Sequence, residues 1–357
     1  MMDRGMDMVE KFFQVAISHN ANDIHLSVGA PPTLRVGGKM ARLKTEPLTA
    51  KDIDQVMRAL TPPRCMVDLS KSGNTDFAYS YNDHRFRIAV YRQCGTISMV
   101  LRHFRDVMFS LDELAIPEQV RSMLLSQRGL FLVTGPTGSG KTTTLASLVD
   151  YINTSSSKHI ITIEDPVEIL HQHKKCLISH REIGTDVNSF SEGVRWSMRH
   201  DPDVIVIGEM RDLETVRIAL KAAETGHLVL ATLHARSASF VIPRIIAEFP
   251  ANEQEFIRMQ LSTALLGVIN QILVPTRAED NMTSVMEILV NTHTVASLIR
   301  QNKESQINDE IRKGRQHGMV HFEDALRDRC VQKMVGWQAA ASFSREPEAF
   351  RCRMEKK

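Results

Sequence analysis

One short segment of the sequence has the residue types and spacing of a phosphate-binding loop. Residues 135–142 fit the pattern G-x-x-x-x-G-K-[ST]. Glycines at 138 and 140 allow successive backbone N–H groups to point inward at phosphate, and Lys141 can reach the β- and γ-phosphates. The Thr142 hydroxyl is a candidate Mg²⁺ ligand. We therefore predict that ATP and Mg²⁺ bind here, at Gly135, Pro136, Thr137, Gly138, Ser139, Gly140, Lys141, Thr142 and Thr143.

Carboxylates follow two apolar runs farther along the chain. Glu209 comes directly after Val204–Gly208, and Glu164 and Asp165 follow Ile160–Ile163. A carboxylate at the exit of a buried strand can orient water or hold Mg²⁺ beside a phosphate loop. We assign Glu209 as general base or water-positioning residue and as a metal ligand, Glu164 as a second catalytic carboxylate, and Asp165 as a metal ligand. The alternatives are a Glu209 that pairs with Arg211 and solvated loop acids at 164 and 165.

A histidine ends a third apolar run. His234 follows Leu228–Leu233 and could donate a hydrogen bond to the γ-phosphate of ATP, although a lone histidine is often a structural residue. Arg195, Arg199 and Arg211 are further candidates for phosphate contact. Ordinary ion pairs explain these arginines equally well, because only a guanidinium fork aimed at phosphate would distinguish them.

The phosphate-binding pattern has its usual meaning only between a strand and a helix. The apolar run Leu130–Thr134 precedes it, and apolar residues at 145, 148, 149 and 152 predict a helix after it. A chance glycine-rich turn, the alternative, would lack this context. With the runs at 160–163, 204–207 and 228–233, we expect buried parallel strands whose carboxyl ends meet at one edge of a sheet.

The remaining helix signals fit this alternation. Asp212 is a candidate N-cap and Gly226 a candidate stop for a helix between the third and fourth runs. The first hundred residues differ, since short helical and strand-like patterns alternate there, and the clearest strand is Arg85–Arg92. We predict a small α+β domain over residues 1–102, a linker over 103–117, and an α/β P-loop domain with a C-terminal helical part over 118–357.

Composition narrows the class of protein. The 357 residues suffice for two domains. The 44 basic residues nearly balance the 42 acidic residues, so the net charge does not indicate a nucleic-acid-binding surface. The five cysteines are scattered and never spaced C-x-x-C, so neither disulfides nor a stable zinc site is expected. No apolar run approaches the roughly 18 residues of a membrane span. We expect a cytoplasmic protein.

Four sequence boxes, in order, resemble the secretion-ATPase superfamily that drives type II secretion and type IV pili. They look like its Walker A, Asp, Walker B and His boxes, at Thr134–Thr143, Ile161–Glu168, Val204–Asp212 and Gly226–His234. The resemblance continues over nearly the whole chain, from Asn20–His25 to Gly318–Leu326. It implies a homo-hexameric ring of subunits, each with an N-terminal PAS-like domain and a RecA-like ATPase domain.

Within this superfamily the chain looks like the pilus retraction ATPases of the PilT/PilU type. Paired C-x-x-C ligands are absent, and the stretches 171–176, 273–276 and 287–292 read like PilU. The resemblance implies ATP-powered pilus retraction and twitching motility, a pilus platform protein of the inner membrane as partner, a PilT/PilU paralogue as a further partner, and a peripheral location at the pilus base. Arg87 and Arg102 resemble the family's phosphate-facing arginines and are assigned as catalytic; a solvated strand face is the alternative.

Two other functions remain open from the sequence. One is an accessory ring component that binds ATP but mainly assists a paralogous retraction motor. The other is a DNA-translocating or conjugation ATPase on the same fold, which the balanced charge does not favour. Turnover by the purified protein alone, and its response to DNA, distinguish the three.

Overall fold

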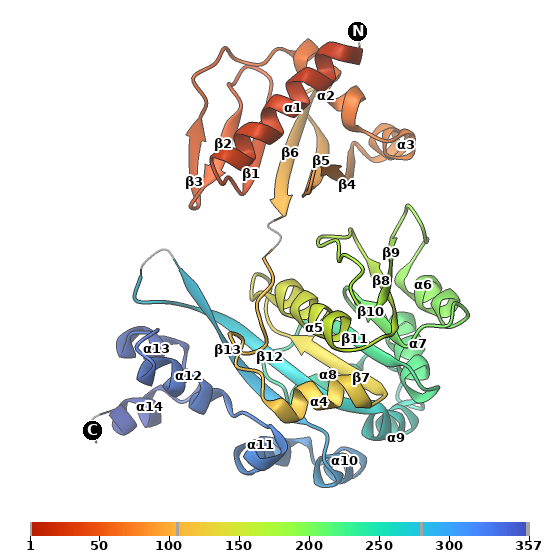
Figure 1. The fold of residues 1–357 in the computed structure, drawn as a ribbon, viewed down its shortest axis with the longest axis vertical. Helices are drawn as coiled ribbons and strands as arrows, with labels where there is room; N and C mark the ends of the chain where they lie inside the picture. Colours follow the sequence, from red (N-terminus) through yellow and green to blue (C-terminus); the bar gives the residue numbers. More distant parts are fainter. Residues whose placement is uncertain (1, 105–106, 279–280, 355–357) are drawn as a thin grey trace. The chain divides into compact units, whose positions relative to one another are not determined.

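The computed structural model describes residues 2–104, 107–278 and 281–354 and divides into two compact units. The first unit comprises Met1–Val107 and Pro166–Leu170, and the second comprises Met108–Asp165 and His171–Lys357. Figure 1 shows the strands and helices of each unit. Each unit has a hydrophobic core of its own.

The first unit is built on a six-stranded antiparallel sheet in the order β3-β2-β1-β6-β5-β4. Phe13 of the first helix stacks on Tyr79, and its ring also lies against Tyr81 and against Phe86, at 4.3 Å between the Phe13 and Phe86 centroids. This aromatic group joins the helix to two strands. The elements are α1 (Met2–Ser18), β1 (Asp23–Leu26), β2 (Thr33–Val36), β3 (Lys39–Arg42), α2 (Ala50–Leu60), α3 (Pro63–Ser72), β4 (Asn74–Tyr81), β5 (His84–Gln93) and β6 (Thr96–Phe104).

The predicted strand Arg85–Arg92 lies within β5, which is therefore confirmed. Tyr81 pairs with His84, so a two-residue turn closes the β4–β5 hairpin, and Asn82 adopts the positive φ of 51° that such a turn needs. Strand β6 extends to Phe104, opposite Arg85. The predicted domain boundary at residue 102 thus falls inside this strand.

The second unit contains a seven-stranded sheet in the order β13-β12-β7-β11-β10-β8-β9. All neighbours are parallel except β12 and β13. The four predicted parallel strands are confirmed, so their carboxyl ends do meet at one edge of the sheet. The strands are β7 (Gly129–Thr134), β8 (His159–Glu164), β9 (Leu177–Glu182), β10 (Val204–Ile207), β11 (Leu228–Leu233), β12 (Leu265–Pro275) and β13 (Met282–Val290).

Helices α5 and α7 both contact β7 and β11. The chain moves from β7 to β8 in one direction along the sheet and from β10 to β11 in the other. Because such crossovers are right-handed, these two helices cover opposite faces. The helices are α4 (Glu118–Ser126), α5 (Lys141–Ser155), α6 (Phe190–Ser197), α7 (Leu213–Glu224), α8 (Val241–Ala247), α9 (Gln254–Ala264), α10 (His293–Arg300), α11 (Ile307–Lys313), α12 (Phe322–Val331), α13 (Trp337–Phe343) and α14 (Pro347–Met354).

The predicted helix signals around α7 are confirmed. The Asp212 side chain accepts a hydrogen bond from the Thr215 N–H, as an N-cap does, and Gly226 has a φ of 104° just beyond the helix. The predicted helix that follows the phosphate-binding loop is α5, which begins at Lys141, within the last two residues of the pattern. Local sequence therefore determines where these two helices start.

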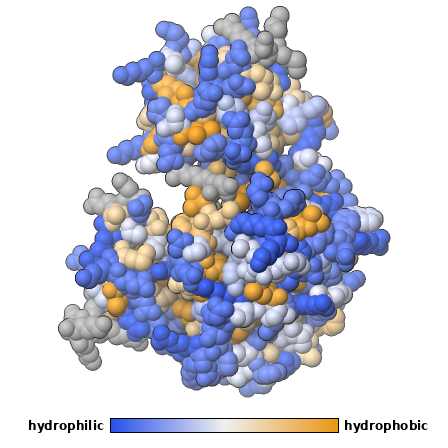
Figure 2. Space-filling model, in the orientation of Figure 1, coloured by the Kyte–Doolittle hydropathy of each residue, from blue (hydrophilic) through white to orange (hydrophobic). Residues whose placement is uncertain are grey.

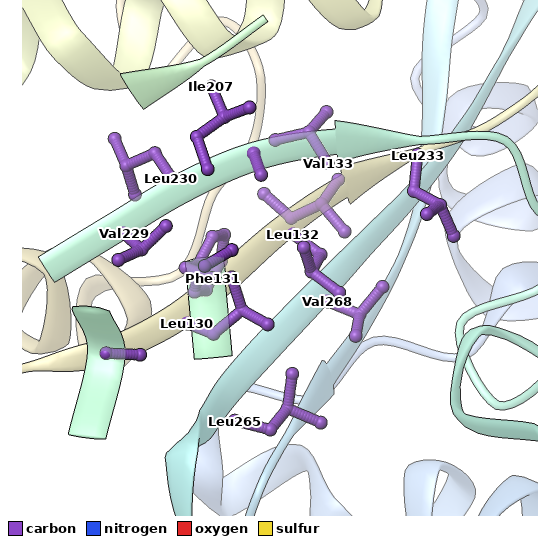
Figure 3. Packing of buried hydrophobic residues seen from close by; sticks show 14 of the residues in the cluster. Leu130, Phe131, Leu132, Val133, Ile207, Val229, Leu230, Leu233, Leu265 and Val268 are labelled. Carbon is purple, nitrogen blue, oxygen red and sulfur yellow. The ribbon is translucent and has the colours of Figure 1, made fainter. Parts of the chain in front are cut away.

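The centre of the sheet is buried on both faces. Every residue of β7, β10 and β11 is buried. Figure 3 shows Phe131, Leu132 and Val133 of β7 packed among side chains of the neighbouring strands β11 and β12. A phosphate-binding loop that follows such a strand starts from a rigid support.

Polar residues cover most of the face drawn in Figure 2, and hydrophobic residues appear there only in small groups. In the ranges described, we find no helix with the length and apolar character that crossing a membrane requires. Cys65, Cys94, Cys176 and Cys330 are free thiols; the side chain of Cys352 lies outside the description.

Gly267 marks an irregularity where β12 leaves the regular ladder with β7. A Cβ atom there would lie 2.7 Å from the Leu289 carbonyl oxygen and 3.0 Å from the Phe131 ring. We predict that Gly267→Ala lowers the free energy of unfolding of the second unit by about 1–3 kcal/mol through overpacking. Urea denaturation measures this change.

Gly336→Ala is the matched control, because a Cβ atom at Gly336 meets no neighbour within 4 Å. Its free energy of unfolding should stay within about 0.5 kcal/mol of the wild type. Equal stabilities for the two variants would contradict the close approach at Gly267.

Candidate active site

The loop between β7 and α5 has a backbone that only glycine adopts easily. Gly138 and Gly140 have φ values of 77° and 85°, and Gly140 is the N-cap of α5. A Cβ atom at Gly135 would lie 2.6 Å from the Ser139 hydroxyl oxygen and closer still to the Gln271 carbonyl oxygen. The glycines of the pattern are thus required by the geometry of the loop.

The loop presents donors that suit an anion. The first N–H of α5 that is paired belongs to Thr144, which donates to the Gly140 carbonyl at 3.0 Å. Among the hydrogen bonds of the described residues, the N–H groups of Lys141, Thr142 and Thr143 have no acceptor. The Ser139 hydroxyl is buried and also lacks a partner. A nucleotide phosphate would supply acceptors to these groups, so the residues present fit this ligand.

Lys141 folds back over the loop. Its Nζ donates to the carbonyl oxygens of Gly135 at 3.2 Å and of Pro136 at 3.0 Å. Burial lowers the pKa of the Lys141 ammonium, and the charge of Glu209 opposes that shift. The cation therefore lies at the mouth of the loop, where a phosphate oxygen could replace its carbonyl partners.

Glu209 lies two residues beyond β10 and has a close partner at each carboxylate oxygen. Oε2 is 2.8 Å from Arg211 Nε, and Oε1 is 3.0 Å from His234 Nε2. Burial alone would raise the pKa of the Glu209 carboxyl. The hydrogen bond and charge of Arg211, with the charges of His234 and Lys141, outweigh burial and lower that pKa. The carboxylate is therefore ionised at neutral pH, and the pairing with Arg211 considered from the sequence does occur.

His234 joins Glu209 to the phosphate-binding loop. Its Nδ1 is 3.2 Å from the Gly135 carbonyl oxygen and 3.5 Å from Lys141 Nζ, while its Nε2 faces Glu209. The ends of β7, β10 and β11 therefore meet through one imidazole ring. The histidine has structural contacts here, and its proposed contact with the γ-phosphate stays a prediction.

Glu164 ends β8 beside the same edge. Gly208 packs against it, since a Cβ atom on Gly208 would lie 3.5 Å from Glu164 Cγ. Its Oε1 is 3.6 Å from His180 Nδ1 on β9, and the His180 ring stacks on His171. Burial, and then the charge of His180, lower the pKa of His171 to about 4. Glu164 thus contacts a histidine pair, and its catalytic assignment stays a prediction.

The predicted metal ligands do not form a ready-made cage. Thr142 and Asp165 are exposed, and Glu209 is held by Arg211 and His234. Within residues 2–104, 107–278 and 281–354, no group of three or more His, Cys, Asp or Glu side chains could hold a metal ion. Mg²⁺ usually takes only one or two carboxylates and completes its shell with water and phosphate oxygens. An open arrangement is therefore compatible with this metal.

Two buried amides hold the loop in place, and the sequence analysis missed them. Gln271 Nε2 donates to the Ser139 carbonyl at 2.6 Å. Asn270 Nδ2 donates to Thr134 Oγ1 and to the Ala235 carbonyl, each at 3.0 Å. Both residues lie on β12 and are 1% exposed. Two consecutive amides inside an apolar run were the available signal.

The predicted catalytic arginines lie in the first unit, where both are paired. Arg87 Nε donates to Asp76 at 2.8 Å, and Arg102 Nε donates to Asp23 at 2.7 Å. Their side chains are 41% and 62% exposed. Their contact with phosphate stays a prediction.

The other arginines considered from the sequence have ordinary partners. Arg195 pairs with Glu214 at 2.8 Å, and the Arg199 guanidinium lies over the Trp196 ring. Arg211 pairs with Glu209, as described above. Of these three, Arg211 is the one that contacts a candidate catalytic carboxylate, Glu209.

Comparison with known proteins places this site in a family. Residues 6–355 match the family described as type II/IV secretion system protein. The chain is 38% identical over 346 residues to the type IV pilus retraction ATPase PilT of Pseudomonas aeruginosa, with 97% of this chain and 100% of PilT covered. It is 35% identical over 336 residues to the type IV pilus ATPase PilU of the same organism, with 94% and 88% covered.

A solved structure agrees with these relatives. The crystal structure of the pilus retraction motor PilT with bound ADP superposes with a TM-score of 0.88 at 38% identity, covering 96% of this chain and 98% of that chain. The predicted resemblance and the RecA-like α/β fold are thereby confirmed. The PAS-like character of the first unit and the closer likeness of the C-terminal half to PilU stay predictions.

The loop geometry yields a test of binding. We predict that Lys141→Ala weakens ADP binding at least tenfold, a loss of about 1.4 kcal/mol, because it removes the one ammonium at the loop. Isothermal titration calorimetry measures the affinity. Lys174→Ala is the control, since Lys174 pairs with Asp150 at the far part of α5. Unchanged ADP affinity in Lys141→Ala would refute the site.

Proposed function

Because this chain belongs to the family of type II/IV secretion system proteins, whose members include PilT and PilU, we propose that it is the ATP-hydrolysing subunit of a type IV pilus retraction motor. The observation that carries the proposal is the Glu209–His234 contact beside the phosphate-binding loop. We infer that this ionised carboxylate faces the phosphates of a nucleotide bound at the loop. The similarity to PilT over nearly the whole of both chains supports retraction as the work performed.

The residues divide the task of hydrolysis. Bound ATP supplies the phosphoanhydride bond that is broken. Lys141 and the unpaired N–H groups of α5 bind the phosphate oxygens and stabilise negative charge that develops there. Ionised Glu209 accepts a hydrogen bond from the attacking water and orients it. His234 keeps Glu209 aligned with the loop, since it touches both.

We propose that Mg²⁺ is held by the Thr142 hydroxyl, with Asp165 and Glu209 acting through its water shell. The exposed positions of Thr142 and Asp165 support this assignment, since a hydrated ion needs room. Nucleotide phosphates would complete the coordination. Metal and nucleotide are then expected to bind together.

We propose that the subunits form a homo-hexamer and that the ring works at the cytoplasmic side of the inner membrane, against the platform protein of the pilus. A PAS-like role for the first unit and cooperation with a PilT/PilU paralogue complete this proposal. The likeness to PilU keeps an accessory role as the second candidate. Turnover by the purified chain alone favours an independent motor, and turnover only with a paralogue favours the accessory role.

The first test separates binding from hydrolysis. We predict that Glu209→Gln retains ATP affinity within about threefold but loses at least 100-fold in turnover, because the shape is kept and the charge that orients water is lost. Calorimetry and a phosphate-release assay measure the two properties. Glu214→Gln is the control, since Glu214 is exposed and pairs with Arg195.

Pilus function follows from the same variant. A piliated bacterium that carries only Glu209→Gln should assemble pili but not retract them, as seen in a twitching assay. Wild-type turnover in this variant would move the catalytic role to Glu164. Loss of turnover with normal twitching would instead contradict the retraction proposal.

The second test concerns the arginines of the first unit. If Arg87 or Arg102 stabilises the transition state, its alanine variant should lose roughly 10³–10⁵ in turnover while still binding nucleotide. Arg58→Ala is the control, because Arg58 is an exposed α2 residue paired with Asp54. Losses below about threefold, only ~0.7 kcal/mol of barrier, would remove both arginines from the mechanism.

A further inference from the structure

We propose that Arg345 and Glu287 are positioning residues that hold the phosphate-binding loop and the His234 segment in register, through the side chain of Asn270. All three lie in the second unit: Asn270 and Glu287 are paired across β12 and β13, and Arg345 is distant from both in sequence. The inference rests on the proposed nucleotide chemistry at the loop. It adds Arg345, near the C-terminal end of the chain, which the sequence analysis did not consider.

Glu287 is a charged residue of β13 with 0% exposure. Its Oε2 accepts a hydrogen bond from the Ala238 N–H at 2.6 Å, and its Oε1 accepts one from Arg345 at 2.7 Å. A buried carboxylate is costly unless it is paired and hydrogen-bonded. Glu287 is therefore committed to Arg345 on one side and to the chain just after His234 on the other.

Arg345 uses the rest of its guanidinium group to reach the same region. One terminal nitrogen donates to Asn270 Oδ1 and to the Arg236 carbonyl, each at 3.1 Å. The planar group lies 4.3 Å over the Phe322 ring of α12. A lysine could not make these contacts together, because it lacks the planar fork.

The segment that carries Arg345 is itself anchored. The Ser344 hydroxyl and the Arg345 N–H each donate to Glu323 of α12 at 2.8 Å. Both Ser344 and Glu323 are buried. Hydrogen bonds thus hold both the backbone and the guanidinium group of Arg345 in place.

Arg345 determines which way the Asn270 amide points. With Oδ1 occupied by Arg345, Nδ2 faces Thr134 Oγ1 and the Ala235 carbonyl. The reversed amide would place its oxygen against the Ala235 carbonyl and its NH₂ against the guanidinium. Thr134 immediately precedes the loop and Ala235 immediately follows His234. One arginine therefore orients the amide that ties both segments together.

The experiment compares Arg345→Met and Arg345→Lys with Arg327→Met, since Arg327 is a partly exposed arginine of α12 that pairs with Asp324. We expect ADP affinity and the KM for ATP to worsen at least fivefold in both Arg345 variants. Arg345→Lys should keep the Tm near the wild type, because an ammonium can still pair with Glu287, so its weaker affinity reports positioning rather than unfolding. Arg327→Met should change neither property.

A double-mutant cycle with Asn270→Ala tests whether Arg345 acts through the Asn270 side chain. If Arg345 acts through Asn270, the double variant Asn270→Ala/Arg345→Lys should bind ADP as weakly as Asn270→Ala alone. Additive losses would overturn the route, and wild-type affinity in Arg345→Lys would overturn the inference. Failure of the wild type to hydrolyse ATP would instead count against the proposed function, since ADP affinity is measured separately.

Discussion

The phosphate-binding loop must keep several backbone N–H groups unpaired at the end of a strand that is buried on both faces. Such a loop has few bonds of its own, so its shape depends on its neighbours. Gln271 holds the Ser139 carbonyl, and His234 holds the Gly135 carbonyl. The parallel sheet brings these neighbours to the loop because β11 and β12 flank β7. The order of the strands in the sheet therefore determines which side chains can hold the loop in its catalytic geometry.

The parts of the site that follow from local chemistry could be predicted from the sequence. Strands β10 and β11 are largely apolar runs, and Glu209 and His234 follow them within two residues, so their meeting at one edge follows from parallel pairing. The same holds for the Asp212 cap, which needs only its own helix. Patterns of this kind can be recognised from a few neighbouring residues of the sequence.

The parts that were missed depend on distant pairing. Asn270 and Gln271 interrupt an apolar run, and their hydrogen bonds to Thr134 and Ser139 span more than a hundred residues of sequence. Strand β9 was also missed, because it lies at the edge of the sheet and most of its residues are polar. No periodicity reports such contacts. The ion pair of Arg102 with Asp23 had to be found in the structure for the same reason.

Asp23 has two arginine neighbours, Arg102 at 2.7 Å and Arg35 at 3.4 Å, although its own side chain is only 5% exposed. The two cations come from strands on either side of β1. A buried carboxylate with a single cationic partner would be destabilised by the loss of that partner, because its charge would then be uncompensated. Because Arg35 also lies within ion-pair distance of Asp23, loss of Arg102 would still leave this buried carboxylate with a counter-ion in the first unit.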